Sequence, residues 1–225
     1  MVIFASALLP VALVGMAFFL LDRNKEPVWA VLRAFLYGVL SAPLLAVFII
    51  PLSLVPFPEQ SSVSQTAVRA FLFAGLPEEL VKYGVFLLSM YRRAEFDEWY
   101  DGILYGVMIG LGFAFVENLG YFWRFFPTDG GAILIGRTLL SMPMHALLGA
   151  VMGYFLGRAK FTLNKAAVPR LMTLALLVPV LFHGTYDFVL MFTPVDLGWL
   201  SAPIVFVLWF YVLRMKRTAQ APQTV

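Results

Sequence analysis

The residues of this 225-residue chain that could perform chemistry lie within long apolar stretches rather than in polar loops. Two carboxylates are adjacent at Glu78 and Glu79, and both histidines of the chain, His145 and His183, lie in later apolar stretches. Two imidazoles with carboxylates and no thiol form a donor set that suits zinc at a catalytic site, where water completes the coordination shell. A carboxylate beside that water can act as its general base. These residue types therefore indicate metal-assisted hydrolysis.

The spacing of these residues indicates which of them share a helix face. His183 and Asp187 are four residues apart, as are Glu78 and Lys82, so each pair lies on one face of a helix. Glu78 and Glu79 are neighbours and point about 100° apart, which predicts different roles for the two carboxylates.

The composition identifies the class of protein. Hydrophobic residues make up 61% of the chain and charged residues only 13%, and cysteine is absent. A soluble domain of this size could not bury so much apolar surface. Disulfide frameworks, thiolate metal sites and cysteine nucleophiles are excluded. We expect an all-α integral membrane protein with a single polytopic domain over residues 1–225, in contact with lipid and not with nucleic acid.

Seven apolar stretches are long enough to be transmembrane helices, which need about 20 residues. The first lacks a basic leader region and its apolar run is too long for a signal peptide, so it is interpreted as a span. The expected spans are Met1–Leu21, Val28–Val55, Gln65–Met90, Trp99–Phe126, Ala132–Gly157, Leu171–Phe192 and Leu197–Leu213.

The basic residues predict the orientation of these spans. Eleven of the 16 lysines and arginines fall in the first, third and fifth loops and in the C-terminal tail. Because cytoplasmic loops carry an excess of basic residues, the N-terminus is expected outside and the C-terminus in the cytoplasm. The eleven residues are Arg23, Lys25, Arg92, Arg93, Arg158, Lys160, Lys165, Arg170, Arg214, Lys216 and Arg217.

The ionisable residues inside the spans must compensate one another. A charged group at the centre of a membrane helix costs about 2.5–3.5 kcal/mol. Five such groups would together cost roughly 12–18 kcal/mol if each were charged and unpaired. We therefore expect the third to sixth spans to form a polar catalytic cavity. The five groups are Glu78, Glu79, Lys82, Glu117 and Asp187.

Prolines and small residues predict how these spans bend and pack. Pro77, Pro143 and Pro179 each remove one helical hydrogen bond close to a polar motif. A break at 75–77 would place Glu78 and Glu79 in the first turn of a half-helix, where the helix dipole favours carboxylates. Small residues at four-residue spacing predict close helix packing. They are Gly102, Gly106, Gly110 and Ala114 in one span and Gly149, Gly153 and Gly157 in the next.

Four motifs resemble those of the PrsW family of intramembrane proteases, which is related to the CAAX prenyl protease and bacteriocin-processing (ABI) group. They are Glu78-Glu-x-x-Lys82, Phe113-x-x-x-Glu-Asn118, His145-x-x-x-Gly149 and His183-x-x-x-Asp187, and they occur in the family's order over about residues 65–192. In the wider group, His stands at the position of Glu117 in the second motif, and Asn stands at the position of Asp187 in the fourth.

The resemblance implies cleavage of a single-pass membrane protein near its extracytoplasmic face, with membrane-anchored anti-sigma factors as the substrates usually inferred for the family. It implies that Glu78 and Glu79 are the catalytic carboxylates. His145 and His183 become metal ligands or transition-state groups. Together with the polar spans, it predicts zinc or a similar ion held by His145, His183 and Glu117, with Glu78 or Glu79 activating the water.

Several roles stay open at this stage. Glu117 is either the third ligand or a structural partner of Lys82 or Arg137. Asn118 either donates to a developing oxyanion or bridges helices. Arg137 either contacts the substrate backbone or serves as the counter-ion of Glu117. Asp187 is interpreted as a supporting residue that orients its neighbouring histidine.

Three other functions fit the same polar residues. The first is a metal-independent glutamate peptidase of the same fold, in which two carboxylates share acid and base duties. The second is a proton- or ion-coupled transporter or channel, because intramembrane acidic and histidine chains also relay protons. The chain has no evident inverted repeat, which many transporters carry. The third is a catalytically inactive binding protein.

Overall fold

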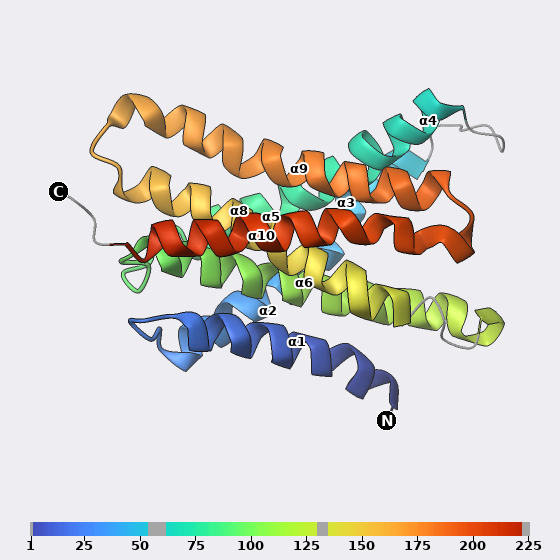
Figure 1. The fold of residues 1–225 in the computed structure, drawn as a ribbon, viewed down its shortest axis with the longest axis horizontal. Helices are drawn as coiled ribbons and strands as arrows, with labels where there is room; N and C mark the ends of the chain where they lie inside the picture. The colour runs from blue at the N-terminus through green and yellow to red at the C-terminus, as the bar shows by residue number, and fades with distance from the viewer. Residues whose placement is uncertain (1, 54–61, 130–134, 222–225) are drawn as a thin grey trace.

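The computed structural model describes residues 2–53, 62–129 and 135–221, and every regular element in these ranges is helical. The helices run roughly along one long axis and form a single bundle, as Figure 1 shows. The expected all-α membrane fold is confirmed. The helices are α1 (Val2–Leu21), α2 (Val28–Leu44), α3 (Ala46–Ser53), α4 (Val63–Val68), α5 (Leu76–Ser89), α6 (Trp99–Asp129), α8 (Met142–Phe161), α9 (Val168–Phe192) and α10 (Ala202–Ala219).

Helices α6 and α8 form the buried centre of the bundle. Both are apolar around most of their circumference, which is typical of helices enclosed by other helices. Added Cβ atoms at Gly106 and Gly149 would each overlap the carbonyl oxygen of the other residue, and Gly102 and Gly153 oppose each other in the same way. The backbones of α6 and α8 therefore touch along the glycines, and the packing role expected for these small residues is confirmed.

Five described helices are long and apolar enough to cross a membrane. They are Val28–Phe48, Trp99–Arg124, Arg137–Phe161, Lys165–Phe192 and Leu197–Ala219. The first expected span is helical over Val2–Leu21, and its part from Leu8 to Leu21, where side chains are described, counts as a shorter apolar helix. The third expected span is helical from Val63 to Ser89. It is not among the five because it contains four charged side chains, and three of these lie in its polar motif.

The outer helices present apolar side chains to their surroundings. Leu13 on α1, Leu36 on α2, Leu181 on α9 and Phe206 on α10 are all more than half exposed. Because lipid tails are as apolar as leucine, these surfaces suit a bilayer and would be unfavourable in water.

Two short π-helical segments precede the helices that carry polar motifs. The first spans Arg69–Gly75 and leads into α5, and the second spans Arg137–Ser141 and leads into α8. Pro77 and Pro143 lie in the first turns of those helices, where a missing N–H is tolerated. The expected break at 75–77 is therefore a widened helical turn rather than non-helical backbone. π-Helical turns are frequent at functional sites.

The second expected span is also divided. Its helix α2 ends at Leu44, just after Pro43, and α3 begins at Ala46. Residues 54–55 of that expected span, and residues 132–134 of the fifth, lie outside the described ranges.

The basic loops lie at one end of the bundle, where Figure 1 shows the α1–α2 and α8–α9 connections beside the C-terminus. Lys160 Nζ donates to the carbonyl oxygens of Arg93 and Phe96 at 3.1 and 2.6 Å. Arg23 donates to the carbonyl oxygen of Gln220. These hydrogen bonds join the fifth loop to the third and the first loop to the tail. We call this end of the bundle the basic end.

The α6–α8 contact predicts that substituting two glycines of α6 will have very different effects on stability. Gly106→Ala places a methyl group on the backbone of Gly149, which cannot move away, whereas Gly120 has nothing within 4 Å. Overpacking typically costs 1–3 kcal/mol. We expect Gly106→Ala to lower the midpoint of thermal unfolding in mild detergent and Gly120→Ala to leave it unchanged or raise it. Equal midpoints would contradict the close backbone contact.

Candidate metal centre

Glu78 and Glu79 lie side by side in the first turn of α5 but face different neighbours. Glu79 is fully buried, and its Oε1 atom lies 2.6 Å from Lys82 Nζ and 2.8 Å from His183 Nδ1. The Oε2 atom of Glu78 lies 3.7 Å from His183 Nε2 and 3.9 Å from Lys82 Nζ. The two carboxylates therefore contact opposite edges of one imidazole, which supports the expectation from their spacing that they differ in role.

Lys82 links the carboxylates of α5 to α8. Its Nζ atom lies 3.0 Å from His145 Nδ1 as well as 2.6 Å from Glu79. The ring of Phe113 on α6 lies beneath it, with 4.3 Å between Nζ and the ring centroid, and the same ring packs on His145. Lys82 is therefore held by a carboxylate, an imidazole nitrogen and an aromatic face, all within the bundle.

His183 reaches this cluster because α9 lies very close to the π-helical turn before α5. A Cβ atom at Gly75 would lie 3.1 Å from the backbone nitrogen of Gly184, and one at Gly184 would collide with the ring of Phe71. Two glycines thus let the elements approach until Glu79 can contact His183 Nδ1. On its other edge, His183 Nε2 lies 3.4 Å from Asp187 Oδ2.

Glu117 on α6 is held at the edge of the cluster. Its Oε2 atom lies 2.7 Å from Arg137 Nη2 and 3.0 Å from His145 Nε2. Arg137 also donates through Nε to Asn118 Oδ1 at 2.9 Å and stacks on Tyr121, with 3.6 Å from its guanidinium carbon to the ring centroid. The counter-ion role that the sequence left open for Arg137 is thus present, and so is the bridging role of Asn118.

Three of these side chains form a group that could hold a metal ion. One donor atom from each of Glu78, His145 and His183 lies within 4.8 Å of the others, and all three residues are largely buried. Buried oxygens of Glu78 and Glu79 accept no hydrogen bond within the described part of the chain. His145 and His183 lie with 5.1 Å between their ring centroids. This donor set is the mixture of imidazole and carboxylate that zinc accepts.

The charge balance of the cluster also fits a divalent cation. Its four carboxylates face two cationic side chains, which leaves a formal charge of −2 when both histidines are neutral. An uncompensated charge inside a bilayer is costly, and one divalent ion would balance this excess. The carboxylates are Glu78, Glu79, Glu117 and Asp187, and the cations are Lys82 and Arg137.

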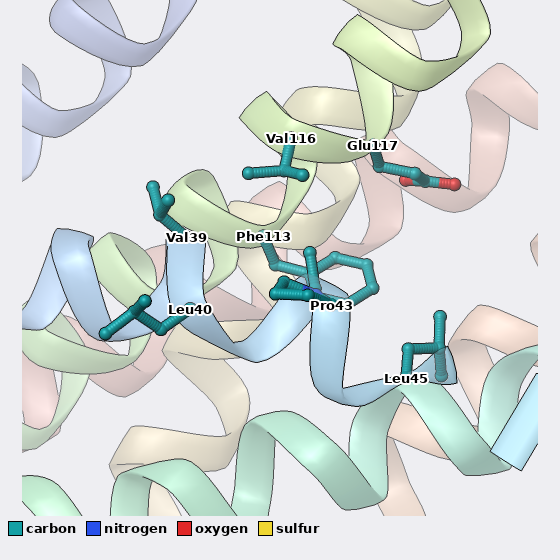
Figure 2. A pocket seen from close by; sticks show the side chains of 8 residues that line it. Val39, Leu40, Pro43, Leu45, Phe113, Val116 and Glu117 are labelled. Atoms are coloured by element: carbon teal, nitrogen blue, oxygen red, sulfur yellow. The ribbon is translucent and has the colours of Figure 1, made fainter. Parts of the chain in front are cut away.

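Two hollows meet at Glu117. One of about 410 Å³ is apolar and lies between α2 and α6, with Leu40 and Pro43 on one side and Phe113 and Val116 on the other, as Figure 2 shows. The other, of about 530 Å³, is lined by Glu117, Gly120, Tyr121 and Arg124 and lies toward the C-terminal part of α6. We call them the apolar groove and the polar hollow.

Comparison with known proteins agrees with this site. The family model described as PrsW family intramembrane metalloprotease matches residues 26–214. The chain belongs to the PrsW family. The proteins named Protease PrsW of Bacillus subtilis, Geobacillus kaustophilus and Clostridioides difficile are 37%, 35% and 32% identical to it. The matches cover 91%, 92% and 92% of this chain and 89%, 89% and 87% of those relatives. No solved structure matches the chain.

Membership of the PrsW family confirms the resemblance carried by the four motifs and makes the chain an intramembrane metalloprotease. The structure brings all the candidate residues of the sequence analysis into one region of the bundle, on α5, α6, α8, α9 and the π-helical turn before α8. It groups Glu78, rather than Glu117, with the two histidines. Which carboxylate binds the metal stays a prediction.

Two features of the PrsW-type site were missed from the sequence. Phe113 was noted only as a motif letter, yet its ring supports both Lys82 and His145. No role was given to the second span, whose Leu40 and Pro43 line the apolar groove. Pro43 was the feature of the sequence that could have indicated this groove, because a proline in an apolar span marks a place where the helix ends or bends.

The contacts of His183 predict graded losses of metal. We expect close to one metal ion per chain, measured by mass spectrometry of the protein in mild detergent, and almost none in His183→Ala. Glu79→Gln retains the three donors but loses the carboxylate that orients His183, so its metal affinity is expected to fall about 10–100-fold. Thr185→Ala, on the exposed face of α9, is the control. Equal metal content in all four proteins would contradict this centre.

Proposed function

We propose that this protein hydrolyses a peptide bond of a single-pass membrane protein, using water activated at a zinc ion within the bundle. The observation that carries the proposal is the buried group of Glu78, His145 and His183. A membrane-anchored anti-sigma factor is one protein of this substrate class.

The contacts favour different roles for the four carboxylates of the site. Glu78, His145 and His183 hold the metal, which when bound acidifies water and polarises the scissile carbonyl. Glu79 fixes the orientation of His183, and Lys82 holds Glu79 and His145 in place. Asp187 lies beside the Nε2 edge of His183 and supports the same ring.

Glu117 is the best-placed general base. It is one-fifth exposed, borders both hollows and lies 3.0 Å from His145 Nε2. A metal bound at that nitrogen would displace the contact and leave Glu117 facing the water. Glu117 then takes a proton from the attacking water and returns it to the amine of the leaving peptide, so one water molecule is added across the bond.

Asn118 and Arg137 are suited to stabilise the negative charge that develops on the carbonyl oxygen. Arg137 donates to Asn118 Oδ1, which leaves the buried Nδ2 group of Asn118 as a donor without a partner in the described residues. A buried donor that needs an acceptor is favourable for an oxyanion that forms only during the reaction.

The two hollows would separate the paths of substrate and water. The apolar groove between α2 and α6 suits an apolar peptide segment that arrives through lipid, and its wall residue Phe113 contacts His145. The polar hollow suits water. Because the hollows share Glu117, both reactants would meet at that carboxylate.

The position of the site along the bundle supports cleavage near the face opposite the basic end. His145 precedes the end of α8 at Phe161 by 16 residues, which is about 24 Å of helix. A bilayer core is about 30 Å thick. With the basic end in the cytoplasm, as the positive-inside rule predicts, the cleaved bond lies near the extracytoplasmic face of a bacterial membrane.

Two amide substitutions distinguish ligand from base. Glu78→Gln is expected to lose both metal and cleavage, because a neutral amide is a poor ligand for zinc. Glu117→Gln is expected to keep the metal and lower kcat by about 10²–10⁴-fold, which is the usual contribution of a general base. The measurement is metal content beside cleavage of a reconstituted membrane substrate. If Glu117→Gln loses the metal and Glu78→Gln keeps it, the two roles are reversed.

A substitution in the apolar groove tests the path of the substrate. Leu40→Trp fills the groove, whereas Leu36→Trp places the same indole one turn earlier on α2, outside the lining. We expect Leu40→Trp to raise KM about tenfold with little change in kcat or metal content, because only substrate binding is lost. Identical kinetics for the two variants would exclude this path.

A further inference from the structure

A second group of carboxylates lies at the basic end, far along the bundle from the catalytic site. It consists of Glu26 in the loop between α1 and α2, Asp97 in the loop between α5 and α6, and Asp101 in the first turn of α6. One oxygen from each lies within 4.8 Å of the others. We call these three residues the loop carboxylates.

Two of the loop carboxylates are buried. Asp101 is fully buried and Glu26 is 7% exposed, whereas Asp97 is open to solvent. Asp101 Oδ2 accepts hydrogen bonds from the backbone N–H groups of Asp97 and Glu98, at 2.9 and 2.7 Å. The Tyr105 hydroxyl donates to Glu26 Oε2. These bonds fix the positions of the carboxylates without neutralising their charge.

The Oδ1 atom of Asp101 indicates that the loop carboxylates could bind a further ligand. It is buried and accepts no hydrogen bond from any residue that the structure describes. Within the same ranges, no lysine or arginine forms an ion pair with the loop carboxylates. The nearby Lys160 donates to backbone carbonyls instead. Burying a carboxylate oxygen beside another carboxylate is unfavourable unless a cation or a shared proton lies between them, and the exposed side of this group at Asp97 gives a cation access from solvent.

We propose that the loop carboxylates bind a divalent cation of the Mg²⁺ or Ca²⁺ class. All three donors are oxygens, which these hard cations prefer, and neither an imidazole nor a thiolate that would select zinc is part of the group. The exposed side at Asp97 leaves room for the water molecules that Mg²⁺ retains. This site is distinct from the catalytic centre in both residues and donor type.

Such an ion would connect the loop between α1 and α2, which carries Glu26, to the segment that leads into α6, which carries Asp97 and Asp101. Helix α6 is a central helix and carries Glu117 in its second half. The ion would therefore fix the outer helices α1 and α2 to the start of the helix on which the catalytic site depends.

The test uses the full chain in mild detergent with its catalytic site loaded with zinc, titrated separately with Mg²⁺ and Ca²⁺. Asp101→Asn and Asp97→Asn each replace a charged carboxylate ligand by a neutral amide, and Asp97 is exposed, so that variant keeps the fold. Glu98→Gln is the matched control, because Glu98 lies in the same loop but bonds to Asn24 instead. Mass action predicts a saturable rise in the unfolding midpoint, of about 5 °C, for the unsubstituted protein and Glu98→Gln only.

A second readout needs neither activity nor unfolding. Tb³⁺ substitutes for these cations and emits when a tyrosine or tryptophan close to it is excited, and Tyr105 contacts Glu26 directly. Sensitised emission is expected from the unsubstituted protein and from Glu78→Gln, competed away by Ca²⁺, and lost in Asp97→Asn. If the cations shift all the proteins equally or none of them, or if emission persists in Asp97→Asn, the proposal is overturned.

Discussion

The structure depends on the need to neutralise several carboxylates inside an apolar bundle. An unpaired charge at the centre of a membrane helix costs about 2.5–3.5 kcal/mol. Each polar side chain of the site therefore has to lie against another, and Lys82 and Arg137 each contact a carboxylate and one other polar group. Helices separated by ordinary leucine-sized side chains could not bring these groups within hydrogen-bond distance. Neutralising these charges therefore requires that the helices pack closely.

The glycines meet this requirement where the site needs it. An added Cβ atom at Gly110 would overlap the carbonyl oxygen of His145 itself, so the α6–α8 contact continues up to this histidine. Gly75 and Gly184 do the same between the turn before α5 and α9. Small residues beside each histidine set the helix separation, and the short polar side chains then reach one another without bridging groups.

Features set by local composition and residue spacing were predictable from the sequence, whereas features set by helix rotation were not. Of the seven spans expected from apolar length, five are described helices that are long and apolar enough to cross a membrane. The cost of buried charge predicted that the third to sixth would converge. Glu78 and Glu79 were expected to differ because adjacent residues point about 100° apart. Only the rotation of α5 decides which of them contacts Nδ1 of His183 and which lies nearer Nε2. Pro77 predicted an interruption, yet whether a helix breaks or widens depends on how its neighbours pack.

Metal binding and folding would be coupled at this site, because the metal-free cluster has a formal charge of −2 when both histidines are neutral and all four carboxylates are ionised. Loss of a histidine ligand leaves that excess and adds an empty space, whereas loss of the Glu78 carboxylate removes a ligand together with one negative charge. The two kinds of variant are therefore not equivalent: the first weakens both metal binding and the bundle, and the second weakens chiefly metal binding. If the proposed site is correct, one set of charges serves both catalysis and assembly, and the residues that are most costly to bury therefore lie where the helices pack most closely.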